Sequence, residues 1–165
     1  MRMRAVIVYK SLHHGNTKRI AEAMADACGA DLVQLCERKN PGLQGYGLVG
    51  LGSGIYRSRH HPSLVGFAEK AHFAEGARAF LFSTAGIPAL SGLWHRPLRA
   101  VMEKRGVPIA GELCLPGYDT YAIFGLVGGI NRGRPGEREL ARAREFAGSM
   151  VSAQGAGALS YTSER

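Results

Sequence analysis

The chain has 165 residues and a hydrophobic content of 45%, which fits one globular domain and excludes an intrinsically disordered chain. Because no apolar run approaches ~20 residues and no signal-peptide pattern follows Met1, we expect a cytoplasmic protein without a transmembrane segment. The net charge of +8, from 21 basic and 13 acidic residues, makes an acidic partner surface more favourable than a basic one.

The first predicted strand, over residues 6–8, leads into a polar turn and then into a helix. A run of β-branched residues indicates a strand that is buried on both faces, as in a parallel sheet. A strand, a short turn and a helix in this order direct free backbone N–H groups at an anion. The helix is indicated by apolar residues at helical spacing, namely Ile20, Ala21, Met24 and Ala25.

The turn itself has the residue types of a phosphate site. Gly15 permits a positive φ or a close approach of the backbone, and the hydroxyls of Ser11 and Thr17 can donate hydrogen bonds to phosphate oxygens. The sequence lacks the spacing of a nucleotide-triphosphate loop and the Gly-x-Gly-x-x-Gly fingerprint of a dinucleotide site. The alternative is an ordinary strand-to-helix turn in which Asn16 caps the helix.

The rest of the chain alternates predicted strands and helices. Trp94 lies on the apolar side of the helix predicted over 90–105 and is expected in the core, with stacking on a bound ring as the alternative. Five strands alternating with helices predict an α/β fold, a doubly wound five-stranded parallel sheet with helices on both faces. One domain is expected over residues 1–151, followed by a loose tail over 152–165. Strands are predicted over residues 31–36, 46–52, 77–83 and 109–115, a polar loop over 53–62, and helices over 63–72, 90–105 and 137–151.

The cysteines and histidines lack the spacings of a disulfide framework or of a metal site. Cys28, Cys36 and Cys114 lie among apolar neighbours, which favours buried free thiols. No two histidines are separated by four residues, as two ligands on one helical face would be, so no metal ligand is predicted. No Ser-His-Asp order, carboxylate pair or activated thiol is indicated, so no catalytic residue is predicted either.

The turn after the first strand resembles that of the flavodoxin family, which ends in Thr-Gly-Asn-Thr and holds the phosphate of flavin mononucleotide (FMN). Gly15, Asn16 and Thr17 match that motif, and His14 stands where the family usually has threonine. An imidazole can still donate a hydrogen bond there, but it would make phosphate binding sensitive to pH. The flavodoxin-like strand order 2-1-3-4-5 places the ligand crevice at the carboxyl ends of strands 1 and 3, with strand 4 alongside.

Two further segments would line the same crevice. Gly52-Ser-Gly-Ile-Tyr56 offers a close backbone approach and an apolar or aromatic wall, and Ser83-Thr-Ala-Gly86 offers small residues and hydroxyls. With Leu115-Pro-Gly-Tyr-Asp-Thr120 they resemble flavodoxin-domain proteins of bacteria and archaea that lack the long insertion in strand 5, although each segment is also explained as a plain turn. The candidate cofactor-binding residues are Ser11, His13, His14, Gly15, Asn16 and Thr17 for the phosphate, Gly54, Ile55, Tyr56, Ser83, Thr84, Ala85 and Gly86 along the ring, and Tyr118 at its border.

The resemblance implies an FMN-binding redox protein that transfers electrons between partner enzymes. Two alternatives stay open: a flavin-dependent reductase or oxidase acting on a quinone or protoporphyrinogen-like substrate, and a non-redox binding or regulatory module. Flavodoxins are usually acidic, so positive charge near Arg57, Arg59 and His60 is expected to raise the last reduction potential of the flavin.

The partners are expected to be redox proteins that are acidic or membrane-associated. The arginine-rich segment 132–144 is the candidate docking surface, and a solvated basic helix end is the alternative. Nucleic acid is not expected, because no patch of basic residues interleaved with aromatic ones and no helix-turn-helix or zinc pattern is present.

Overall fold

The structure, a computed structural model, describes residues 4–12, 15–36, 40–117 and 133–160. Its centre is a sheet in which neighbouring strands are parallel along the order β2-β1-β3-β5-β6, while β4 pairs antiparallel with β3. Because β5 and β6 are the fourth and fifth strands expected from the sequence, the doubly wound fold and the order 2-1-3-4-5 are confirmed. The strands are β1 (Arg4–Lys10), β2 (Asp31–Gln34), β3 (Tyr46–Tyr56), β4 (Arg59–His60), β5 (Arg78–Ala85) and β6 (Ile109–Pro116).

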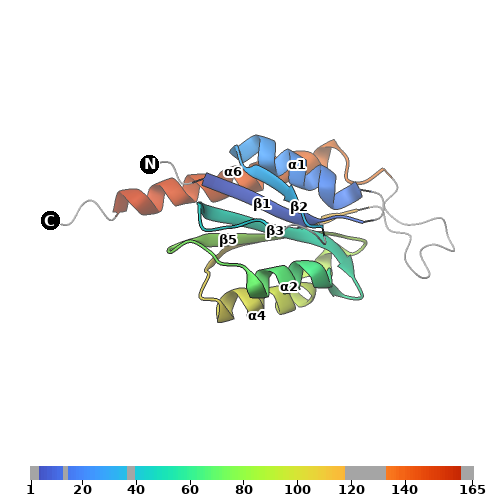
Figure 1. The fold of residues 1–165 in the computed structure, drawn as a ribbon. Helices are drawn as coiled ribbons and strands as arrows, with labels where there is room; N and C mark the ends of the chain where they lie inside the picture. The colour runs from blue at the N-terminus through green and yellow to red at the C-terminus, as the bar shows by residue number, and fades with distance from the viewer. Residues whose placement is uncertain (1–3, 13–14, 37–39, 118–132, 161–165) are drawn as a thin grey trace.

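Helices cover both faces of the sheet (Figure 1). On one face lie α1 (Asn16–Cys28) and α6 (Glu137–Ser160), and on the other lie α2 (Pro62–Lys70) and α4 (Arg96–Lys104). Successive residues of a strand point to opposite faces, so Ile7 packs against α1 and α6, whereas Val6 and Val8 pack against α2 and α4. Burial on both faces explains the unbroken apolar run of the first strand.

Two glycines of β3 make room for the phenyl rings of β5. Gly50 is paired with Phe80, and Gly52 is paired with Phe82. A Cβ added at either glycine would overlap the ring of its partner. These glycines are unusual in the interior of a strand, and they are required here by the close approach of the neighbouring side chains.

The segment expected to be a polar loop over 53–62 is a β-hairpin instead. β3 continues to Tyr56, the chain reverses at Arg57 and Ser58, and β4 pairs back onto β3. Arg57 and Ser58 have φ values of 48° and 62°, as the two central residues of a tight hairpin turn require. The prediction was wrong because neither residue is a glycine or asparagine, the usual sequence signals of such a turn.

The single helix expected over 90–105 is broken at His95. Its first part is a 3-10 turn, η2 (Pro88–Leu90), followed by the short helix α3 (Ser91–Trp94), and α4 starts after His95. Pro97 lies in the first turn of α4, where a residue without an N–H is tolerated. Leu93 is 59% exposed and Trp94 is half-buried, so the expectation that Trp94 lies in the core was wrong.

Two smaller expectations also differ from the structure. The helix expected to end near Val151 continues to Ser160, so the first part of the expected loose tail is helical. The three cysteines are free, but Cys36 is exposed and Cys28 and Cys114 are only half-buried. The prediction of buried thiols was wrong for Cys36, which lies beyond the end of β2.

Candidate functional site

The carboxyl ends of β1, β3, β5 and β6 meet at one edge of the sheet. Their register pairs Lys10 with Ser53, Gly54 with Thr84, and Ala85 with Pro116. The turns that follow these strands are therefore neighbours in space, although they are far apart in sequence. We call this edge the rim.

The turn after β1 and the end of β5 are joined by a hydrogen bond between two buried hydroxyls. Thr17 Oγ1 lies 2.8 Å from Thr84 Oγ1, and the two side chains are 2% and 5% exposed. Gly15, in the left-handed conformation with φ 66°, precedes the first residue of α1 and has no side chain that could cap the helix. Asn16 is thus the first helical residue, and the alternative in which its side chain acts as the N-cap was wrong.

The end of β6 closes onto the same turn. The Gly117 N–H donates to the Ala85 carbonyl oxygen at 3.1 Å. A Cβ added at Gly117 would lie 2.8 Å from Nδ2 of Asn16, so the absence of a side chain lets the end of β6 approach the start of α1. Three strand ends and a helix start are packed together here.

The expected ring-contacting residues of the second segment lie on the β3–β4 hairpin. Ile55 and Tyr56 are half-buried, and Gly54 is buried beneath the Tyr56 side chain. The Tyr56 ring meets the His61 ring edge-on at 5.4 Å. The pairing of Ile55 with His60 and of Tyr56 with Arg59 places these side chains at the rim.

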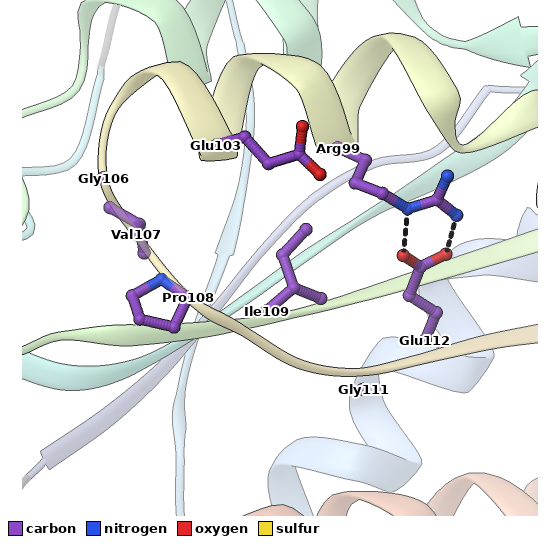
Figure 2. A pocket seen from close by; sticks show the side chains of 8 residues that line it. All are labelled: Arg99, Glu103, Gly106, Val107, Pro108, Ile109, Gly111 and Glu112. Carbon is purple, nitrogen blue, oxygen red and sulfur yellow. Dashed lines mark hydrogen bonds and ion pairs between the residues drawn. The ribbon is translucent and has the colours of Figure 1, made fainter.

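A buried polar network that the sequence did not predict lies behind the rim. Ser83 is 1% exposed, and its Oγ is 2.7 Å from His95 Nε2. His95 Nδ1 is 2.9 Å from a Glu112 carboxylate oxygen. Figure 2 shows Arg99 facing Glu112 through two hydrogen bonds, of 2.7 and 2.8 Å. Although burial opposes it, hydrogen bonds from Arg99 and His95 hold the pKa of Glu112 below its ordinary value.

A second histidine packs against the first. His60 is 0% exposed, its ring centroid is 4.8 Å from that of His95, and its Nδ1 is 2.9 Å from Ser53 Oγ. Burial, and then the proximity of His95, lower the pKa of His60 to about 3. His60 is therefore neutral at pH 7, and the expectation that it contributes positive charge was wrong, whereas Arg57 and Arg59 are exposed.

A family model described as the flavodoxin domain matches residues 6–95. The chain belongs to the flavodoxin domain family. It is 42% identical over 149 residues to the uncharacterized protein MJ0298 of Methanocaldococcus jannaschii. This match covers 90% of this chain and 99% of that protein. Membership in this family implies a flavin cofactor and a redox function.

Solved flavodoxins share the fold. A short-chain flavodoxin associated with a PDU bacterial microcompartment superposes with a TM-score of 0.63 and 11% identity, covering 92% of this chain and 99% of that one. A flavodoxin from the domain Archaea superposes with a TM-score of 0.59 and 15% identity, covering 90% and 97% of the two chains.

Large apolar side chains are exposed around the rim of this flavodoxin domain. Leu12 follows β1, and Ile87, Leu90 and Leu93 follow β5, with exposed fractions from 41% to 59%. They make up all but one of the exposed large apolar residues in the described part of the chain, so apolar exposure is concentrated at the candidate site.

Some of the remaining predicted site residues are described by the structure, and others are not. Ser11 is buried at the end of β1, Ala85 is buried at the end of β5, and Gly86 is half-buried beside it. His13, His14 and Tyr118 lie outside the described residues. Within the described ranges, no three histidine, cysteine or acidic residues gather as a metal site would require, and no helix has the length and hydropathy needed to cross a membrane.

Proposed function

We propose that this flavodoxin domain binds FMN non-covalently at the rim and transfers electrons between partner enzymes. The hydrogen bond between Thr17 and Thr84 carries the proposal, because it joins the turn after β1 to the end of β5 beside the start of α1. An anion-binding helix start and the ends of two strands would then form one continuous site, as a phosphorylated ring compound requires.

The start of α1 suits the phosphate. Gly15 precedes the helix in the left-handed conformation, and a Cβ added there would meet no described atom within 4 Å outside its chain neighbours. The first N–H groups of the helix and the helix dipole favour an anion. If Thr84 donates to Thr17, the Thr17 hydroxyl proton is left for a phosphate oxygen. Ser11, His13, His14 and Asn16 would complete the phosphate site.

The ring would lie along the ends of β3 and β5. Gly54, Ile55 and Tyr56 would border one side of it, and Thr84, Ala85 and Gly86 the other, with Tyr118 at its border. Bound FMN supplies one- and two-electron transfer, and the protein sets its orientation and its exposure. The half-buried Ile55 and Tyr56 provide an apolar wall for the ring, while the Ser83 hydroxyl is engaged with His95 and would support the site from behind.

The exposed apolar residues and the net charge of +8 indicate what docks at the rim. A redox partner with an acidic or membrane-associated surface and an apolar centre would fit both features. The rate of electron transfer with such a partner should fall as ionic strength rises. A rate that does not change with salt would contradict charge steering.

The same exposed apolar residues favour a second candidate, a flavin-dependent reductase or oxidase acting on an apolar substrate such as a quinone or protoporphyrinogen-like compound. Such an enzyme would turn over in the absence of any protein partner. Steady-state assays with and without a partner distinguish the two functions.

Cofactor binding is tested by purifying the protein, recording its visible spectrum and titrating the apo-protein into FMN. We expect flavin absorbance, FMN as the compound released on denaturation, and quenching of FMN fluorescence at micromolar protein. Riboflavin, which lacks the phosphate, is the matched control and should bind much more weakly. A colourless protein that leaves FMN fluorescence unchanged would overturn the proposal.

A further inference from the structure

The buried network behind the rim connects both ring-bordering strands to one ion pair. Ser53 on β3 and Ser83 on β5 are paired directly across the sheet. Each hydroxyl contacts a different buried histidine: Ser53 contacts His60, and Ser83 contacts His95. The two imidazole rings then pack on each other, with an angle of 35° between their planes.

Only one assignment of donors and acceptors fits the two hydrogen bonds of a neutral His95. An ionised carboxylate accepts and cannot donate, so the proton of His95 lies on Nδ1, facing Glu112. In the neutral ring Nε2 is then an acceptor, and the Ser83 hydroxyl must donate to it. Arg99 holds the Glu112 carboxylate from the other side, so the ion pair sets the orientation of the whole chain of bonds.

The hydrogen bonds of His60 are ordered in the same way. The Ser53 hydroxyl donates to the Gly54 carbonyl oxygen at 2.7 Å and accepts from the His61 N–H at 3.0 Å. His60 Nδ1 therefore donates to Ser53, which leaves Nε2 of His60 as a buried acceptor without a partner in the described part of the chain. Ser53 and Ser83 directly precede Gly54 and Thr84, and these two residues are also paired across the sheet.

A network of this kind is an expensive way to stabilise a fold. Buried polar groups that are replaced by apolar groups of the same shape often leave a protein as stable or more so, and an unpartnered nitrogen such as His60 Nε2 adds a further cost. The network does restrict geometry, because each bond has a single donor and a single acceptor. It therefore does more to define the arrangement of the strand ends than to stabilise the sheet.

We propose that His95 is a positioning residue of the flavin pocket: by accepting from Ser83 and packing on His60, it holds the ends of β3 and β5 at the spacing that admits the ring. This inference rests on the proposed function, because it assumes that FMN binds at the rim. His95 itself is 0% exposed and does not reach a ligand there.

A double-mutant cycle on FMN affinity tests the proposal. Ser83→Ala and His95→Phe should each weaken FMN binding about tenfold, and the double variant should bind no more weakly than His95→Phe, because both changes break the same link. His95→Gln can accept from Ser83 and donate to Glu112, so it should recover most of the affinity. Leu98→Ala, in the core beneath α4, is the control: it lowers the stability of the apo-protein but should change FMN affinity less than twofold.

A second measurement does not depend on FMN. Long-range ¹⁵N correlation spectra of the apo-protein at pH 7 should show His95 neutral with its proton on Nδ1, and Glu112→Gln should remove that preference. A proton on Nε2 would overturn the proposal. So would additive losses in the cycle, or variants that all bind FMN as the wild type does. If the wild type itself does not bind FMN, the proposed function is contradicted. If the wild type binds FMN and the variants bind it equally well, only the positioning role of His95 is contradicted.

Discussion

The two sides of the sheet hold the candidate site with different chemistry. Ser83 and Thr84 are consecutive residues of β5, so their side chains point to opposite faces. On the side of α1, Thr84 meets Thr17, and both groups are uncharged hydroxyls. On the side of α2 and α4, Ser83 meets His95, which leads to a second buried histidine and to an ion pair.

Because of this difference, we expect the two halves of the site to respond differently to acid and to steric changes. In its described part, the half that would hold the phosphate uses backbone N–H groups and short hydroxyls, none of which titrates near neutral pH. His13 and His14 would be its titratable members, and their protonation would favour an anion there. The half that would border the ring depends on imidazoles that are buried in the neutral form. Protonation in acid should therefore destabilise the second half, where the imidazoles are buried, and steric changes should disturb the α1 side, where Gly52 and Gly117 leave no room for a side chain.

The largest effect is expected where the α1 side is packed most tightly. Gly52→Val would place a branched side chain into the Phe82 ring, and the crowding should lower the free energy of unfolding by about 3 kcal/mol. Urea unfolding of the apo-protein measures this. Gly66→Ala is the control, because a Cβ at Gly66 of α2 meets nothing within 4 Å, and it should leave stability unchanged or raise it by up to about 1 kcal/mol. Equal losses in both variants would contradict the packing argument.

The second effect is a pH dependence that belongs to the α2 and α4 side. The pKa of His60 falls from its ordinary 6.5 to about 3 on folding, so the unfolded chain binds more protons between these values. The contribution of His60 to stability is therefore fully present above about pH 6.5 and falls by about 1.4 kcal/mol per pH unit below it, or about 2 kcal/mol between pH 7.5 and 5. His95 adds to the loss in the same direction, because burial also lowers its pKa.

Variants isolate the contribution of His60. His60→Phe removes a buried imidazole and keeps a ring against His95, so its stability should depend less steeply on pH than that of the wild type. His72→Gln removes an exposed histidine and should leave the slope unchanged. Urea unfolding at several pH values between 7.5 and 5 provides the comparison. An unchanged slope in His60→Phe would show that the buried pair does not set the acid sensitivity.

The two halves also differ in how well the sequence predicts them. The apolar run of β1, the apolar spacing of α1 and the Gly15-Asn16-Thr17 turn are local patterns, and they predicted the strand, the turn and the helix correctly. That this turn binds phosphate stays a prediction. Contacts between distant residues have no such pattern: Ser83, His95 and Glu112 belong to three different elements, and nothing in their spacing marks them as neighbours. One local signal was present, since His95-Arg-Pro97 interrupts the apolar stripe where the helix breaks.

A third effect tests whether the α1 side binds the phosphate as proposed. Thr17→Val keeps the shape of the side chain and removes its hydroxyl, so FMN affinity should fall about tenfold, and the same loss should appear at pH 7.5 and at pH 6. Fluorescence titration measures it. Ser149→Ala, an exposed hydroxyl on α6 that donates to the Phe146 carbonyl oxygen, is the control for loss of a hydroxyl away from the rim. A Thr17→Val loss that grows in acid would contradict the contrast between the two sides.

The smallest effect concerns the hairpin on the α2 and α4 side. Ser58 has φ 62°, a conformation that costs a residue with a side chain more than it costs glycine, so Ser58→Gly should raise the free energy of unfolding by about 0.5 kcal/mol. Ser63→Gly in the first turn of α2 should lower it instead, because the backbone there is helical and glycine loses more entropy. If the hairpin serves only to connect β3 to α2, Ser58→Gly will change the free energy of unfolding and leave FMN affinity unchanged. If it holds Ile55 and Tyr56 against the ring, the same variant will also bind FMN more tightly, because less of the binding free energy is spent on ordering the turn.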